Sequence, residues 1–124
     1  MKVKIIVAII ALLALFTVCY SAELYPSAEK TADALIKTGS GTYGGMIVIT
    51  DATNACTVKV YDNTAASGTA ILPTMTCPGD SSTSGVNTCV LSNINLGFST
   101  GLYADMTVGG GGSCTYNVGR RSGR

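Results

Sequence analysis

Apolar residues follow two patterns along the chain, one at the N-terminus and another after residue 44. The first is an unbroken apolar stretch from Ile5 to Phe16. From residue 44 to residue 118, short apolar runs alternate with turn-forming residues at about ten-residue spacing, which is typical of an antiparallel sandwich or barrel. We therefore expect an all-β fold, a small antiparallel β-sandwich or barrel of about 6–8 short strands, preceded by an N-terminal signal helix.

Seven segments carry the alternation or the apolar run expected of a strand. Residues 46–50 are apolar on both faces, as in a central strand of a sandwich. In residues 56–62 only one face is apolar, that of Cys56, Val58 and Val60, so this face should be buried. The expected strands are residues 32–38, 46–50, 56–62, 69–72, 86–91, 101–108 and 113–118.

Glycines cluster at two places. Gly109–Gly112 lies between the last two expected strands and predicts a hairpin turn. Gly39, Gly41 and Gly44 have the G-x-G-x-x-G spacing of a dinucleotide-binding loop, but such a loop follows a strand and opens a helix. Here a strand follows the glycines, so we interpret them as a hinge before the first core strand.

Two structures fit the segment that precedes this hinge. Residues 27–37 could form a short helix capped by Ser27, whereas residues 32–38 alternate as a strand or extended arm would, and we favour the second. The chain then divides into a secretory signal peptide (1–22), an N-terminal arm or linker (23–43), a β-sandwich domain (44–118) and a basic C-terminal tail (119–124).

The first 22 residues have the features of a secretory signal. Lys2 and Lys4 precede the apolar stretch, and small residues ending at Ala22 follow it. As a helix the stretch is about 18 Å long, shorter than the roughly 30 Å hydrocarbon core of a bilayer. We expect export through a bacterial inner membrane to the extracellular cell surface, with membrane contact only through this segment before cleavage.

The cysteines agree with an oxidising compartment. Cys19 falls within the signal, which leaves an even set of Cys56, Cys77, Cys89 and Cys114. Three pairings are possible. The strand pattern favours a Cys77–Cys89 bridge that closes a local loop and a Cys56–Cys114 bridge across the core, because both strands of the second pair carry apolar residues on the face of the cysteine. A zinc site is disfavoured, since no C-x₂₋₄-C pair occurs.

Charge and missing residue types exclude several functions. After residue 22, six basic and seven acidic residues give a net charge of −1, so we expect no nucleic-acid partner. The chain has no histidine, which removes Ser-His and Cys-His catalysis. We expect no enzymatic activity, no cofactor and no metal. The aspartates near turns, which we interpret as bonding to backbone, are Asp51, Asp62, Asp80 and Asp105.

Partner contacts are expected on the N-terminal arm and on the polar face of the strand at 56–62. Tyr61 points away from Val58 and Val60, and exposed tyrosines serve as interface anchors or as platforms for sugars. Ordinary packing of strand tyrosines is the alternative. The candidate partner-binding residues are Tyr25, Leu35, Ile36, Tyr43 and Tyr61.

Two resemblances to known proteins accompany this pattern. The segment Val58–Thr69, after a glycine-led apolar strand, resembles the strand–turn–strand of small β-sandwich virion proteins of tailed phages. The layout of the whole chain, with its signal, N-terminal arm and β head rich in glycine and threonine, is similar to the secreted geopilin domain 2 proteins. The second resemblance implies a β-rich subunit that pairs with a separate, short helical pilin in a type IV pilus.

The sequence lacks the prepilin cleavage-site glycine followed by phenylalanine, with a glutamate five residues into the helix, so it is not a pilus core subunit by itself. We expect a non-catalytic structural subunit of an extracellular filament or pilus. Its expected partners are a short helical pilin subunit, copies of itself, or both. The alternatives are a phage virion decoration protein and a secreted sandwich module that binds carbohydrate or a surface.

Overall fold

The computed structural model describes residues 24–51, 53–79 and 85–121, and these residues form an all-β fold, as expected. The expected signal segment, residues 1–22, lies outside the described part, and so do residues 80–84. The elements are β1 (Leu24–Pro26), β2 (Ala34–Thr38), β3 (Gly41–Thr50), β4 (Cys56–Asp62), β5 (Met75–Cys77), β6 (Asn87–Leu91), β7 (Leu96–Phe98), β8 (Gly101–Val108), the short 3₁₀ turn η1 (Gly109–Gly111) and β9 (Cys114–Arg121).

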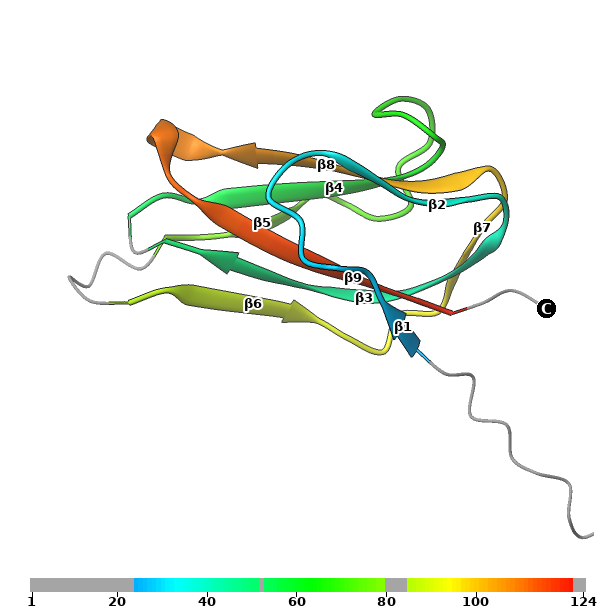
Figure 1. The fold of residues 1–124 in the computed structure, drawn as a ribbon, viewed down its shortest axis with the longest axis horizontal. Helices are drawn as coiled ribbons and strands as arrows, with labels where there is room; N and C mark the ends of the chain where they lie inside the picture. The colour runs from blue at the N-terminus through cyan, green and yellow to red at the C-terminus, as the bar shows by residue number, and fades with distance from the viewer. Residues whose placement is uncertain (1–23, 52, 80–84, 122–124) are drawn as a thin grey trace, which may run out of the picture.

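Two antiparallel sheets form the layers of a sandwich (Figure 1). Sheet I has the strand order β1-β9-β3-β6, and β7 also pairs with β3. Sheet II has the order β2-β8-β4-β5. Because β3 and β9 pair over most of their length, and β4 and β8 do the same, each sheet has two long central strands that carry most of the core.

The core lies between the facing sides of these central strands. Sheet I contributes Val48 and Val118, and sheet II contributes Val58, Val60 and Leu102, each with an exposed fraction of 1% or less. Burying an aliphatic side chain of this size stabilises the folded state by roughly 1.5–3 kcal/mol. The buried face expected for residues 56–62 is therefore confirmed.

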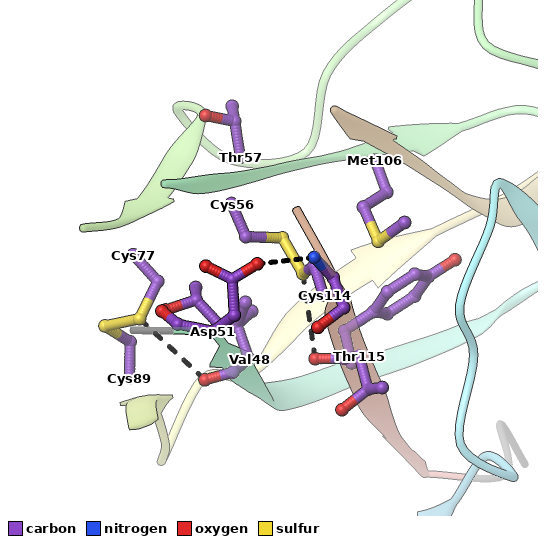
Figure 2. Close-up of a disulfide and its surroundings, with 12 residues drawn as sticks. Val48, Asp51, Cys56, Thr57, Cys77, Cys89, Met106, Cys114 and Thr115 are labelled. Atoms are coloured by element: carbon purple, nitrogen blue, oxygen red, sulfur yellow. Dashed lines mark hydrogen bonds between the residues drawn. A yellow bond between two sulfur atoms is a disulfide. The ribbon is translucent and has the colours of Figure 1, made fainter. Parts of the chain in front are cut away.

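Both expected disulfides are present, and both join one sheet to the other. Cys56 of β4 is bonded to Cys114 of β9, with 6.0 Å between Cα atoms. Cys77 of β5 is bonded to Cys89 of β6, with 5.7 Å between Cα atoms. Cys56 and Cys77 are direct neighbours across the β4–β5 pair. The two bridges therefore lie at one end of the sandwich, as Figure 2 shows.

Several strand boundaries differ from the expected ones. Residues 69–72 do not form a strand, and only Ala70 makes an isolated bridge, to Tyr61. The described residues contain nine strands, more than the six to eight expected. The additional strands β1, β5 and β7 have three residues each, too few to show a period along the sequence.

The turn at Gly109–Gly112 is a connection between sheets and not the expected hairpin. β8, which precedes it, lies in sheet II, whereas β9, which follows it, lies in sheet I. Gly110 and Gly111 adopt left-handed conformations, with φ values of 60° and 76°. Four consecutive glycines allow this crossing, but their composition alone does not distinguish it from a hairpin.

The glycine-rich segment at residues 39–45 is not a hinge. β3 begins at Gly41, so residues 41–43 belong to the sandwich and not to a linker. Gly45 has a φ of 139° at a register irregularity between β3 and β9. A Cβ atom at this position would overlap the carbonyl oxygen of Leu91. Residues 41–45 are therefore a closely packed part of a central strand, whereas Gly39 and Ser40 form the turn that precedes it.

The segment expected to be a free arm is paired with both sheets. β1 pairs with β9, the Ser27 N–H donates to the Val118 carbonyl at 2.8 Å, and Lys30 and Tyr116 exchange two backbone hydrogen bonds of 2.9 Å. The chain then joins sheet II, where β2 pairs with β8. The described residues of the expected arm or linker (23–43) are thus held within the sandwich, and the strand expected at residues 32–38 is present as β2.

We expect replacement of Cys56 and Cys114 by alanine to lower the melting temperature sharply. The bridge spans 58 residues, and in the chain-entropy model a loop of this length contributes about 4 kcal/mol. The melting temperature should fall by roughly 15 °C or more, measured by circular dichroism. The matched variant without Cys77 and Cys89, whose bridge spans 12 residues, should lose less. If the melting temperature of the Cys56 and Cys114 variant were unchanged, the core bridge would not contribute to the stability of the fold.

We expect Gly45→Ala to destabilise the fold by roughly 2 kcal/mol or more, because the new Cβ meets backbone at a φ that favours glycine. Urea unfolding measures this difference in free energy. Gly97→Ala is the control, since no atom lies within 4 Å of the added Cβ. Equal stability of the two variants would mean that residue 45 is not closely packed.

Candidate functional site

The residues expected to contact a partner are not gathered on one surface. Leu35 on the edge strand β2 is 44% exposed, whereas Ile36 is half-buried against the core. Tyr43 is fully buried and Tyr61 is 9% exposed. The side chain of Tyr25 lies outside the described part of the structure. Of the four side chains described, only Leu35 is largely accessible.

Burial has a clear cause for each of the two buried tyrosines. Tyr43 lies within the core cluster, and its burial raises the pKa of the hydroxyl. Tyr61 points to the outer side of sheet II, as its parity predicts, but the isolated bridge to Ala70 brings a loop beside it. The Lys59 ammonium also lies 5.1 Å from the centre of its ring. Of the two interpretations of Tyr61, an exposed anchor and ordinary packing, the structure supports packing.

Among the described residues, the main accessible apolar surface is the outer side of sheet I. Ile47 and Ile49 of β3 are 44% and 38% exposed, and Val90 of β6 is 60% exposed. Ile47 pairs in register with Val90 on one side and Asn117 on the other, and Ile49 pairs with Thr115. We call these five residues, Ile47, Ile49, Val90, Thr115 and Asn117, the isoleucine face.

Two grooves cross this surface and share Pro26, Ile47 and Asn117. One has a volume of about 230 Å³ and extends toward Val90 and Asn93. The other has a volume of about 300 Å³ and extends toward Ile49. Their walls are mostly apolar, which is the usual character of a surface that contacts another molecule.

The sequence pattern concealed this surface. Because residues 46–50 are apolar on nearly every position, alternation could not show which side faces solvent. The structure buries Met46, Val48 and Thr50 and exposes Ile47 and Ile49. The inward position of Cys114 indicates which side of sheet I is buried. It applies to β3 only once Cys114 is known to lie opposite Thr50.

Asp51 holds two loops together at the end of the sandwich that contains the disulfides (Figure 2). Its Oδ1 accepts hydrogen bonds from the Asn54 and Thr53 N–H groups at 2.7 and 2.9 Å. Its Oδ2 accepts one from the Ser113 N–H at 2.6 Å. These bonds, led by that from Asn54, lower the pKa of Asp51 to about 2.

Asp62, the last residue of β4, makes a similar set of contacts. Its carboxylate accepts hydrogen bonds from the N–H groups of Thr100 at 2.7 Å and Ser99 at 2.9 Å. The bonds from Thr100 and then Ser99 lower the pKa of Asp62. Both carboxylates thus bond to backbone, as expected for aspartates near turns, although Asp62 does so across 37 residues of sequence. Asp80 lies outside the described residues.

The described ranges give no further candidate for a site. Within them, no three or more acidic, cysteine or histidine side chains are grouped to hold a metal ion. No helix among these residues is long and apolar enough to cross a membrane. Comparison of the chain with protein-family models, curated proteins and solved structures found no match. The isoleucine face is therefore the candidate functional site.

We expect stability to fall in acid through Asp51 and Asp62. Folding lowers the pKa of both carboxylates, so their stabilising effect is complete above the ordinary value of 3.8 and is lost as the pH falls below it, for Asp51 toward its folded-state pKa of about 2. Asp51→Asn should lower the melting temperature at pH 7 and flatten its decrease between these two values. Ser113→Ala, which keeps the N–H donor, should retain the steep decrease. Melting temperatures would be measured across this pH range. If they fell as steeply with pH for Asp51→Asn as for wild type, Asp51 would not be a source of the acid sensitivity.

Proposed function

We propose that this chain is an exported, non-catalytic structural subunit of an extracellular filament or pilus. In this proposal the isoleucine face packs against the apolar side of a short helical pilin subunit. The observation that carries the proposal is the exposure of Ile47, Ile49 and Val90 on one side of one sheet. A contiguous apolar surface on a small domain is typical of a protein–protein contact.

The shape and polarity of the isoleucine face suit a helix. Ile47 and Ile49 are two residues apart on one strand, which places their side chains roughly 7 Å from each other along the face. The side chains beside them, Thr115 and Asn117, are uncharged. Glu29 and Arg121 each line one of the grooves, so charged side chains are available at the margin of the contact. An apolar groove with such a margin is a common receptor for an amphipathic helix.

The rest of the molecule also supports a structural role outside the cell. Two disulfides join the sheets, and disulfides persist in oxidising compartments. Asp51 and Asp62 bond to backbone N–H groups of loops. Carboxylates used in this way stabilise a rigid module and leave its faces for contacts with neighbouring subunits.

This proposal moves the partner contact away from the residues first expected to make it. β1 and β2 pair with β9 and β8, so the backbone of the N-terminal segment is held within the sandwich, and of its candidate residues with a described side chain only Leu35 is largely exposed. The sugar-binding alternative relied on Tyr61, which is 9% exposed. The virion alternative relies only on the resemblance of Val58–Thr69. An apolar face suits a protein–protein contact better than it suits sugar binding, and this supports the filament proposal over the sugar-binding alternative.

We expect Ile49→Asp to abolish incorporation into surface filaments while leaving the fold intact, because a charge would be buried against an apolar partner. Filaments sheared from cells would be purified and their subunit stoichiometry measured by mass spectrometry. Thr107→Asp is the matched control, since it adds the same charge to an exposed position on β8 in sheet II. The control should incorporate like wild type.

Two results would overturn the proposal. In the first, the wild-type chain is not a stoichiometric component of any surface filament. In the second, Ile49→Asp incorporates as well as Thr107→Asp does. Melting temperatures of both variants establish that a loss of incorporation does not arise from unfolding.

A further inference from the structure

The edges of the two sheets are not equally protected against pairing with another chain. An exposed edge strand presents unpaired N–H and carbonyl groups, and proteins usually block it with proline, charge, irregular register or short length. β1 has three residues and ends in Pro26, and β5 has three residues and is followed by Pro78. β2 carries Lys37 beside a register irregularity. Three of the four edges therefore carry a blocking feature.

The fourth edge, β6, carries none of these features. Its five residues, Asn87–Leu91, pair with β3 in regular register and include no proline and no charge. The sequence has no charged residue from 81 to 104. Val86 and Val90 are 71% and 60% exposed at this edge. Within the described part of the chain, β6 pairs with β3 alone.

The direction of the free backbone groups follows from the neighbouring strand pair. The Asp51 N–H donates to the Ser113 carbonyl, so odd-numbered residues of β3 direct their backbone toward β9 and even-numbered residues toward β6. Val48 therefore bonds to Cys89. Backbone groups alternate along a strand, so those of Thr88 and Val90 point away from sheet I.

We propose that β6 pairs antiparallel with β6 of a second copy of this chain, about a two-fold axis at Cys89. Thr88 of each copy then lies opposite Val90 of the other. In an antiparallel ladder such a pair exchanges both N–H···O bonds, so every outward backbone group of these residues finds a partner. Cys89 does not obstruct this pairing, because its side chain is bonded to Cys77 of the other sheet.

Charge makes self-pairing more favourable at the β6 edge than at the β2 edge. Two-fold pairing places an edge beside itself, so a charged edge meets its own charge. Pairing of β2 with itself would bring two copies of Lys37 together, whereas β6 brings together only uncharged side chains. The exposed Val90 side chains of the two copies would also lie on one continuous outer surface with Ile47 and Ile49. This pairing does not depend on the proposed filament partner.

The experiment uses the oxidised, exported chain in the absence of other proteins. Sedimentation equilibrium should show a monomer–dimer equilibrium for wild type. Thr88→Pro removes one outward N–H from each copy, so we expect dimerisation to weaken by about tenfold or more. Thr88→Ser keeps the N–H and should dimerise like wild type. Because proline is tolerated at an edge position whose N–H faces solvent, the melting temperature of the monomer should change little.

Amide hydrogen exchange of the wild-type chain tests the same pairing without any variant. Exchange at Thr88 and Val90 should slow as protein concentration rises, whereas Cys89, whose N–H faces β3, should be protected at every concentration. A wild-type chain that is monomeric at about millimolar concentration, where even weak pairing is populated, would overturn the proposal. It would also be overturned by undiminished dimerisation of Thr88→Pro, or by exchange at Thr88 and Val90 that is independent of concentration.

Discussion

The disulfide between Cys56 and Cys114 is the constraint on which the arrangement of this protein depends. It joins a central strand of each sheet and places both cysteines in the core. Because Cys114 lies opposite Thr50 in the β3–β9 register, its inward position also turns Thr50 and Val48 inward. Alternation along β3 then directs Ile49 and Ile47 to the solvent. The bridge thus determines which side of sheet I is available to a partner.

The remaining polar interactions leave the faces and one edge of the sandwich free. Asp51 and Asp62 bond to loop backbone and connect segments distant in sequence. The N-terminal segment closes an edge of each sheet through β1 and β2. The accessible apolar groups that remain are concentrated on the isoleucine face and along β6. A structural subunit needs such surfaces, and the proposed contacts with a helical partner and with a second copy use different parts of them.

Prediction from sequence succeeded where a strand has one apolar and one polar face or is bounded by turns. β4 and β8 have the expected bounds, and the favoured pairing of the cysteines, in which strand parity supported Cys56–Cys114, is the one observed. It failed for β1, β5 and β7, whose three residues contain no period. It also failed at the glycines, because Gly109–Gly112 permits both a hairpin and a crossing between sheets. The candidate site was missed because Ile47 and Ile49 lie in a run with no polar face.

The sequence by itself determined the all-β class and the core side of β4, because alternation is a local property of the chain, whereas it favoured one of three cysteine pairings without determining it. Only the tertiary structure decided the sheet to which each strand belongs, the outward side of β3 and the burial of Tyr43 and Tyr61. These features depend on which distant strand or loop lies beside a residue. Ile47 is exposed because no strand of the described chain covers that side of sheet I, and Tyr61 is covered because a loop residue, Ala70, pairs with its backbone.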